Sequence, residues 1–417
     1  MKSNPPPDSQ TPGRGLEQGP GQSPGQWAVR WFAVVFVAVL CVSVPVVHIV
    51  WYGVLGNDEA VLKTYSQKKA PVATTKNVLS GDWMLKKERE LQDLSPVVWS
   101  LRGHWNELRF RMGIPQSDKV TFGRDGWLFS TGAMHHNFRQ FDRAQAKRLA
   151  AFAEVRDAVR ASGGELVVAI VPDKARVYAD RAFPGGVMPV RKAKLYGDLL
   201  AELDSLGIAR VDLATPLVAM RATIKSVKPD DQLYFAHDTH WRPAGALVAG
   251  AAISAVVESR FGATLSPRQT LRLTGPSNAR AVGDLASLLG LLSGLRLDSD
   301  RGQHTVAMSL LTDDLAEVRQ YFGAEVVTKA GPVGMFGNDP DAEIVVVGSS
   351  FSKENGMIAM AFALSRPVHG NIELGASASV PMQATLEQLR NGRTPKVVIW
   401  EIVERGLFSA FWLDPKL

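Results

Sequence analysis

The feature that most constrains the fold is an alternation of short apolar runs with longer helical patterns beyond residue 120. The strand-like runs, rich in Val and Ile, lie at 166–171, 209–212, 344–348 and 397–402. The helical stretches between and around them lie near 143–161, 191–205, 243–259 and 380–390. Such alternation is typical of a mainly parallel sheet with helices on both faces. We therefore expect an α/β fold, with functional groups beyond the carboxyl ends of its strands.

One of these strands runs directly into a serine-rich turn. The apolar run Glu343–Val347 is followed by Gly348-Ser349-Ser350-Phe351-Ser352. In an α/β fold, a serine just past the end of a buried strand, among glycine and small residues, is in the position of an exposed nucleophile.

A second motif, His237-Asp238-Thr239-His240-Trp241, supplies a carboxylate and an imidazole two positions apart. In extended backbone those two side chains share a face, so Asp238 can orient the ring of His240. Together with the serine turn this makes a Ser-His-Asp system in the chain order Asp, His, Ser.

The two motifs together resemble the SGNH-hydrolase-like AlgX/AlgJ family of exopolysaccharide (alginate-type) O-acetyltransferases. In that family a D-T-H-W segment supplies the acid and base, and a later G-x-S-[YF]-S turn supplies the serine. Segments 123–129, 168–174 and 397–405 resemble the family's entry hairpin, first sheet strand and last strand. The resemblance covers about residues 115 to 410, and it is closer to AlgJ because no C-terminal carbohydrate-binding module follows.

The resemblance implies an SGNH-like (flavodoxin-like) domain with Ser350, His240 and Asp238 as catalytic residues and no cofactor. His240 would take the Ser350 proton as the hydroxyl attacks an acetyl ester, and Asp238 would hold the imidazole. A sugar hydroxyl would then accept acetyl from the serine. Two alternatives stay open: an acetylesterase that uses water with the same three residues, and a non-catalytic membrane-anchored scaffold of a polysaccharide synthesis complex.

Three further residues are candidates for substrate binding. Lys174 and Arg176 follow a sheet strand at the edge where the site is expected, and Trp241 is a candidate sugar platform or a packing residue. A metal site built on His237, Asp238 and His240 is disfavoured, because no further His or Cys lies at ligand spacing; we expect no metal.

Other polar residues are given structural interpretations. His135-His136 is interpreted as a surface loop pair, and Glu401 with Arg405 as an ion pair. The single cysteine, Cys41, excludes an intrachain disulfide. The net charge of +6 comes without a Lys/Arg-rich run, so we expect no nucleic-acid partner.

The N-terminus predicts a membrane anchor. Residues 1–26, with six prolines and five glycines, are expected to form a disordered tail. Trp31 to Leu55 has no Asp, Glu, Lys or Arg and exceeds the roughly 20 residues that span a bilayer, so 27–56 is predicted to be an uncleaved transmembrane signal anchor. Residues 57–115 are predicted to be helical and membrane-proximal, and 116–417 to be the acetyltransferase domain.

Charge does not decide the orientation of the anchor, because three basic residues precede it (Lys2, Arg14, Arg30) and three follow it (Lys63, Lys68, Lys69). The resemblance implies a cytoplasmic N-terminus, a single inner-membrane span and a periplasmic catalytic domain. Activated acetyl carriers are cytoplasmic, so the hypothesis requires a multi-span membrane O-acyltransferase as acetyl donor. A polysaccharide substrate and other polysaccharide synthesis and export proteins complete the expected partners.

Overall fold

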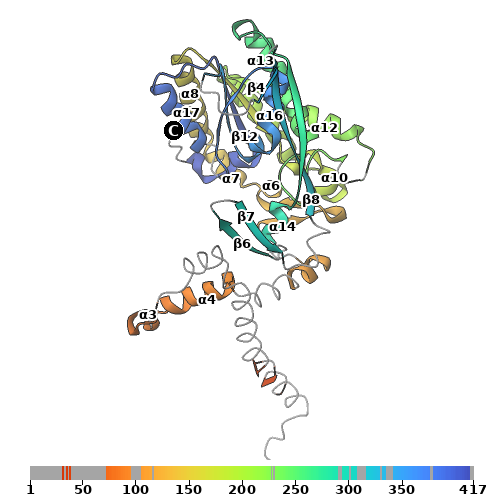
Figure 1. Cartoon of the computed structure of the whole chain (residues 1–417), viewed down its shortest axis with the longest axis vertical. Coiled ribbons are helices and arrows are strands. Elements are labelled where there is room, and N and C mark those ends of the chain that lie inside the picture. Colours follow the sequence, from red (N-terminus) through yellow and green to blue (C-terminus); the bar gives the residue numbers. More distant parts are fainter. Residues whose placement is uncertain are drawn as a thin grey trace, which may run out of the picture. The chain divides into compact units, whose positions relative to one another are not determined.

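The chain is described from a computed structural model (Figure 1). The described residues are 31, 34–35, 37–38, 72–94, 105–114, 117–226, 228, 231–289, 294–299, 302–307, 316–328, 331–334, 341–375 and 379–413. The predicted tail and nearly all of the predicted anchor therefore lie outside the described residues. The chain divides into two compact units, one of Met1–Leu101 with Leu295–Val306 and the other of Arg102–Gly294 with Ala307–Leu417.

The first unit contains two helices, α3 (Thr75–Leu79) and α4 (Asp82–Leu94), and most of a hairpin formed by β6 (Gly294–Ser299) and β7 (Gly302–Ala307). Helix α3 starts at a capping box, in which Thr74 Oγ1 accepts from the Asn77 N–H and the Asn77 side chain accepts from the Thr74 N–H. Residues 75–79 and 82–94 of this unit are thus helical.

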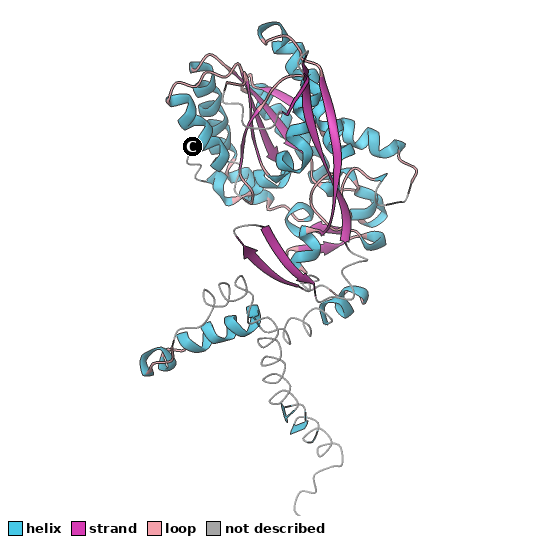
Figure 2. Cartoon of the chain, viewed as in Figure 1, coloured by secondary structure: helices cyan, strands magenta, loops and turns pink. Residues whose placement is uncertain are grey.

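The centre of the second unit is a five-stranded parallel sheet in the order β11-β10-β12-β3-β4. Its strands are β3 (Glu165–Val171), β4 (Ala209–Asp212), β10 (Ile344–Gly348), β11 (His369–Ile372) and β12 (Val397–Val403). Four of the five are the predicted strands, and β11 was not predicted. The prediction of a mainly parallel α/β sheet is confirmed (Figure 2).

Both faces of this sheet are covered by helices because successive side chains of a strand point to opposite faces. Leu166, Val168 and Ile170 of β3 belong to one buried cluster, with residues of α8 (Gln145–Ala161), α11 (Val190–Ser205) and α17 (Ser379–Arg390). Val167, Ala169 and Val171 of the same strand belong to the other cluster, with residues of α9 (Lys174–Val177), α12 (Ala214–Thr223), α13 (Pro243–Phe261) and α16 (Met357–Leu364). All four predicted helical stretches are present as α8, α11, α13 and α17.

Helix α13 carries the one segment, Pro243–Thr264, that is long and apolar enough to cross a membrane among the residues that the structure describes. Its residues Ala246, Ala249, Ile253 and Val257 are buried in the core cluster beside the sheet. It is therefore packed as a core helix of this unit.

A short hairpin precedes the sheet, where the entry hairpin was expected. Strands β1 (Val120–Phe122) and β2 (Leu128–Ser130) pair antiparallel. Asp125 (φ 52°) and Gly126 (φ 78°) at the turn both have positive φ, which Asp and Gly adopt more readily than other residues. The Leu128 N–H donates to the carbonyl of Ala236 at 3.0 Å, so this hairpin supports the segment that precedes Asp238.

The stretch between α13 and β10 contains a second sheet. Helix α14 (Asp284–Leu288) lies in this stretch, and three strands form an antiparallel sheet in the order β5-β8-β9. These are β5 (Leu271–Val282), β8 (Ala316–Thr328) and β9 (Gly331–Gly334). Strand β8 lacks the usual apolar alternation because its buried Glu317 and its largely covered Arg319 bond to the segment 236–238.

Candidate active site

The serine turn lies where β10 ends. Gly348 is the last residue of the strand, Ser350 begins a helical segment, and a π-helical turn η5 (Ser352–Gly356) follows. A Cβ at position 348 would collide with the Ser352 side chain and lie 2.9 Å from Glu401 Oε2, so the tight turn requires glycine there.

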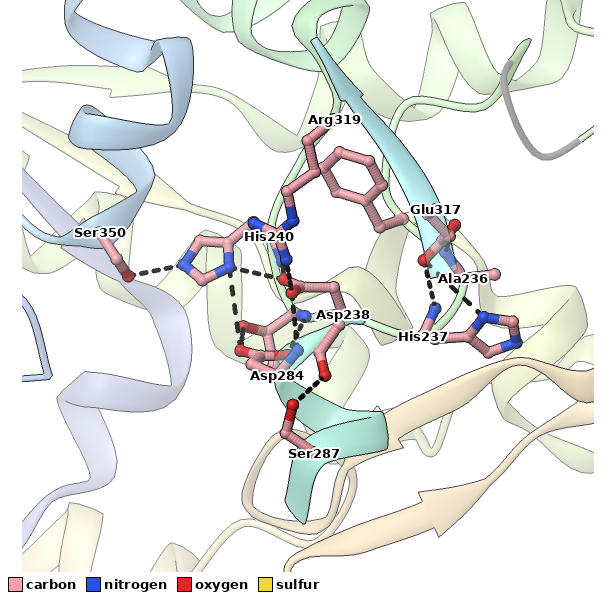
Figure 3. A network of polar contacts seen from close by, with 12 residues as sticks. Ala236, His237, Asp238, His240, Asp284, Ser287, Glu317, Arg319 and Ser350 are labelled. Atoms are coloured by element: carbon pink, nitrogen blue, oxygen red, sulfur yellow. Dashed lines mark hydrogen bonds and ion pairs between the residues drawn. The ribbon is translucent and has the colours of Figure 1, made fainter. Parts of the chain in front are cut away.

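The fold brings Ser350, His240 and Asp238 together in one line (Figure 3). The Nε2 atom of His240 lies 2.7 Å from the Oγ atom of Ser350. Its Nδ1 atom lies 2.6 Å from Oδ1 of Asp238, which also accepts from the His240 backbone N–H at 2.8 Å. Asp238 is 1% exposed and His240 is 9% exposed. The geometry is that of a base positioned beside a hydroxyl and oriented by a carboxylate.

The second oxygen of Asp238 is held by groups that sequence reasoning missed. Oδ2 accepts from the Arg319 guanidinium of β8 and from the Asp284 N–H at 2.7 Å. Burial by itself raises the pKa of this carboxyl, but the hydrogen bond and charge of His240, with the charge of Arg319, outweigh it. The pKa of Asp238 therefore lies well below its ordinary value of 3.8.

Asp284 adds a second carboxylate beside the imidazole. Its oxygens accept from the Thr239 N–H at 2.7 Å and from the Thr239 hydroxyl at 2.5 Å, and Oδ2 lies 3.8 Å from His240 Nδ1. Asp238, His240 and Asp284 each offer a ligand atom within 4.8 Å of the others, so they have the chemistry of a metal site. Their fit to a metal is poor, because Arg319 already supplies the cation at Asp238 and His240 Nδ1 already faces the same carboxylate.

Lys174 is buried beneath the acid–base segment. Its Nζ donates to the carbonyl oxygens of Phe235 (3.0 Å), Ala236 (3.0 Å) and Asp238 (2.8 Å). Burial lowers the pKa of Lys174 from 10.5 to about 8. The ammonium group thus holds the backbone that presents Asp238 and His240.

The other two candidates for substrate binding also bond within the protein. Arg176 pairs with Glu404 through two contacts of 2.5 and 2.9 Å. Trp241 is 1% exposed and donates from its indole nitrogen to the Phe351 carbonyl at 3.1 Å, beside the serine turn. A substrate-binding role for Lys174, Arg176 and Trp241 stays a prediction.

A carboxyl group lies directly under the serine turn. Glu401 on β12 accepts from the Ser349 N–H, the Ser349 hydroxyl and the Ser352 hydroxyl, each at 2.9 Å. Burial raises the pKa of Glu401 above its ordinary value, although these three donors lower it. A charged residue inside the apolar run Val397–Val403 was the available signal for this role, because a carboxyl in a buried strand needs partners.

Two structural interpretations from the sequence need correction, although His135 is exposed as expected. Glu401 bonds to the two serines, while Arg405, its expected partner, lies 3.7 Å from the buried Asp173. His136 was expected on the surface, yet its side chain is fully buried with Nε2 3.2 Å from Asp173 and its ring stacked on Phe408. In both cases a buried carboxylate has polar partners inside the fold.

A cavity of about 430 Å³ opens beside the serine turn. The strand end and turn (Gly348–Ser350), Glu401 and Arg405 line it together with Glu373, Gly375, Pro381, Ile402, Val403, Gly406 and Ser409. Ser350 is thus placed between the imidazole of His240 and a space large enough for a sugar-sized ligand.

Comparisons with known proteins agree with this fold. Residues 120–404 match the family described as ALGX, the SGNH hydrolase-like domain of the acetyltransferase AlgX. A probable alginate O-acetylase AlgJ of Pseudomonas syringae pv. tomato is 30% identical over 354 residues, which cover 83% of each chain. A probable alginate O-acetylase AlgJ of Pseudomonas putida is 28% identical, over 73% of this chain and 74% of its own.

The solved O-acetyltransferase domain of Pseudomonas putida AlgJ superposes with a TM-score of 0.54 at 27% identity, over 69% of this chain and 92% of that domain. The predicted family and enzyme class are thereby confirmed. This chain belongs to the SGNH hydrolase-like acetyltransferase family that includes AlgX and AlgJ, and it is an enzyme of the acyltransferase class.

Proposed function

We propose that this chain O-acetylates an exported bacterial exopolysaccharide through Ser350, His240 and Asp238, by way of an acetyl-serine intermediate. The observation that carries the proposal is the line of contacts from Asp238 through His240 to Ser350, which ends at an open cavity. The relatives named as alginate O-acetylases support acetylation of a polysaccharide as the overall reaction.

In the first half-reaction the Ser350 oxygen bonds to the acetyl carbonyl carbon while His240 Nε2 accepts the hydroxyl proton. The resulting oxyanion needs hydrogen-bond donors, and the Ser350 N–H is suited because the first N–H groups of a helix have no intrahelical acceptor. As the tetrahedral intermediate collapses, the bond to the donor breaks and His240 returns its proton to the leaving oxygen. Asp238 stabilises the imidazolium throughout.

In the second half-reaction a sugar hydroxyl attacks the acetyl-serine ester. His240 Nε2 takes the proton of that hydroxyl, the new ester bond forms, and Ser350 leaves as a hydroxyl after receiving the proton back. The cavity beside Ser350 is the space from which the acceptor reaches the ester. Lys174 and Trp241 hold the two motifs in place, and Arg176 bonds to Glu404 just after the end of β12.

The chain organisation proposed from the sequence serves this reaction. Residues 1–26 form a tail, 27–56 a single-pass inner-membrane anchor, 57–115 a membrane-proximal segment and 116–417 the periplasmic acetyltransferase domain. Because activated acetyl carriers are cytoplasmic, a multi-span membrane O-acyltransferase supplies acetyl across the membrane. Other polysaccharide synthesis and export proteins deliver the acceptor.

The experiment is an acetyl-to-sugar ratio measured on secreted polymer from wild-type, deletion and Ser350→Ala strains. The proposal expects polymer yield to be largely unchanged and the acetyl ratio to fall equally in the deletion and the Ser350→Ala strain. A rise in the ratio identifies an acetylesterase, which uses water in place of the sugar hydroxyl. An unchanged ratio in both strains refutes the enzymatic proposal and leaves the scaffold.

A further inference from the structure

We infer that strand β8 is a brace that sets the distance between the base and the nucleophile, and that Asn355 is the positioning residue through which it holds the serine turn. The inference rests on the proposed role of Ser350 as nucleophile. It concerns residues that neither motif contains.

On one side, β8 holds the segment that carries the acid and base. The Glu317 carboxylate accepts from the Ala236 N–H at 2.9 Å and from the His237 N–H at 3.0 Å, and it pairs with Arg242 at 3.1 Å. Two residues along, Arg319 pairs with Asp238. In a strand these two positions share a face. Side chains on one face of β8 therefore bond to both the backbone and the carboxylate of this segment.

On the other side, the backbone of β8 holds the turn that follows Ser350. The Phe322 N–H donates to Asn355 Oδ1 at 3.0 Å, and Asn355 Nδ2 donates to the Gln320 carbonyl at 2.8 Å. The amide side chain matches both groups because it carries one acceptor and one donor group. Asn355 is 6% exposed, so both bonds are shielded from water.

The backbone of Asn355 is unusual in a way that fits this role. Its φ is 66°, in the left-handed region, and it lies in the π-helical turn η5. Left-handed non-glycine residues cost energy and persist where the surroundings over-determine them, often at functional sites. The two hydrogen bonds from the Asn355 amide to β8, called the Asn355 clamp below, hold its backbone in this conformation. Asn355 lies only five residues after Ser350.

The consequence is that His240 and Ser350, 110 residues apart in the chain, are held at 2.7 Å by contacts that converge on one strand. A base and nucleophile need this alignment before the reaction, because small misplacements cost large factors in rate. Loss of the Asn355 clamp should therefore lower kcat more than it raises KM.

The test compares Asn355→Gly and Asn355→Ala with wild type in the full-length chain, using 4-nitrophenyl acetate as acetyl donor. Glycine tolerates the positive φ, so Asn355→Gly removes the clamp and leaves the backbone conformation accessible. Both variants should lower kcat about tenfold with KM within about twofold. In crystals of the variants, the Ser350 Oγ and the His240 Nε2 should move beyond hydrogen-bond distance.

The matched control is Asn371→Ala, since the Asn371 amide also bridges two elements, through Thr385 at 2.9 Å and Gln388 at 3.0 Å, away from β8. Its kcat should stay within about twofold of wild type. If Asn355→Gly keeps the wild-type kcat and the separation between Ser350 Oγ and His240 Nε2 is unchanged, the inference that β8 positions the serine turn is wrong. If Asn355→Gly does not fold, Asn355→Asp, which keeps the acceptor for Phe322, is measured against the same two criteria.

The two proposals fail separately. Equal acetyl release by wild type and Ser350→Ala defeats the proposed function. The Oγ–Nε2 separation in the Asn355 variants still decides the brace in that case, because it is measured without turnover.

Discussion

Arg319 donates to Oδ2 of Asp238 while Oδ1 of the same carboxylate faces His240 Nδ1 at 2.6 Å. The carboxylate thus lies between a permanent cation and the imidazole that must become a cation during acyl transfer. The hydrogen bond and charge of His240, together with the charge of Arg319, keep Asp238 ionised, and the ionised form is the one that stabilises the imidazolium.

Arg319→Gln should therefore damage both activity and stability. Asp238 is 1% exposed, and leaving a buried charge without its cation costs about 3 kcal/mol. Removal of the cation raises the pKa of Asp238, so the stability that the ionised carboxylate contributes at neutral pH should be lost at a higher pH when the solution is acidified. Chemical denaturation and pH–rate profiles on 4-nitrophenyl acetate check both effects. Arg210→Gln is the control: its pair with Asp204 is 35% and 49% exposed, and its loss should cost less than about 1 kcal/mol.

Ser350→Ala and Ser349→Ala should show which of the two serines is the nucleophile and which supports the turn. Ser350→Ala should lower acetyl release more than about a thousandfold, with a thermal midpoint close to wild type. Ser349 bonds to Glu401 and accepts from the Phe351 N–H at 3.2 Å, so Ser349→Ala should lose stability of about 1 kcal/mol and less than about tenfold in kcat. A reversed order of the two kcat values would place the nucleophile at 349.

Glu401→Gln should change how stability depends on pH. The raised pKa of Glu401 means that the folded chain keeps a proton above pH 4.5, where the unfolded chain releases it. More protons bound in the folded state make the unfolding free energy fall as pH rises through this window. Wild type should therefore lose stability relative to Glu401→Gln as the pH rises above about 4.5. Denaturation curves at unit pH steps check this, with the 44%-exposed Glu165 changed to Gln as control. A constant difference between wild type and Glu401→Gln contradicts it.

Gly348→Ala should disrupt the serine turn. The new Cβ would meet the Ser352 side chain and Glu401, and overpacking of this kind costs about 1–3 kcal/mol. Because the same strain displaces Ser350, kcat should fall by at least about tenfold. Gly197→Ala in α11 is the matched control, since nothing lies within 4 Å of its Cβ and Ala favours a helix, so it should be stable and fully active. Equal behaviour of the two variants would argue against a strained turn.

Chelation should leave the reaction rate unchanged. Arg319 and the imidazole already engage the oxygens of Asp238 that a metal would need. Acetyl release before and after prolonged EDTA treatment, with metal content of the dialysed protein measured, checks the expectation. A loss of activity restored by a divalent cation would establish the Asp238, His240 and Asp284 group as a metal centre.

The sequence by itself was sufficient for four of the five strands of the parallel sheet and for the two motifs. Runs such as 344–348 are buried on both faces and therefore read as continuous apolar segments, while α8 and α17 keep one apolar face. The Asp238-x-His240 spacing and the serine after a buried strand are also local patterns. Their local character is what makes them visible without a structure.

Only the tertiary structure decided which residues support those motifs. Arg319, Asn355 and Glu401 lie 81, 33 to 35 and 49 to 52 residues from the partners they hold, and no local pattern specifies contacts of that length. Strand β8 could not be recognised from hydrophobic periodicity, because the residues that it directs toward the site are charged. Hydrophobic periodicity reports burial in an apolar core, whereas burial against Asp238 and the serine turn depends on partners that folding alone brings near.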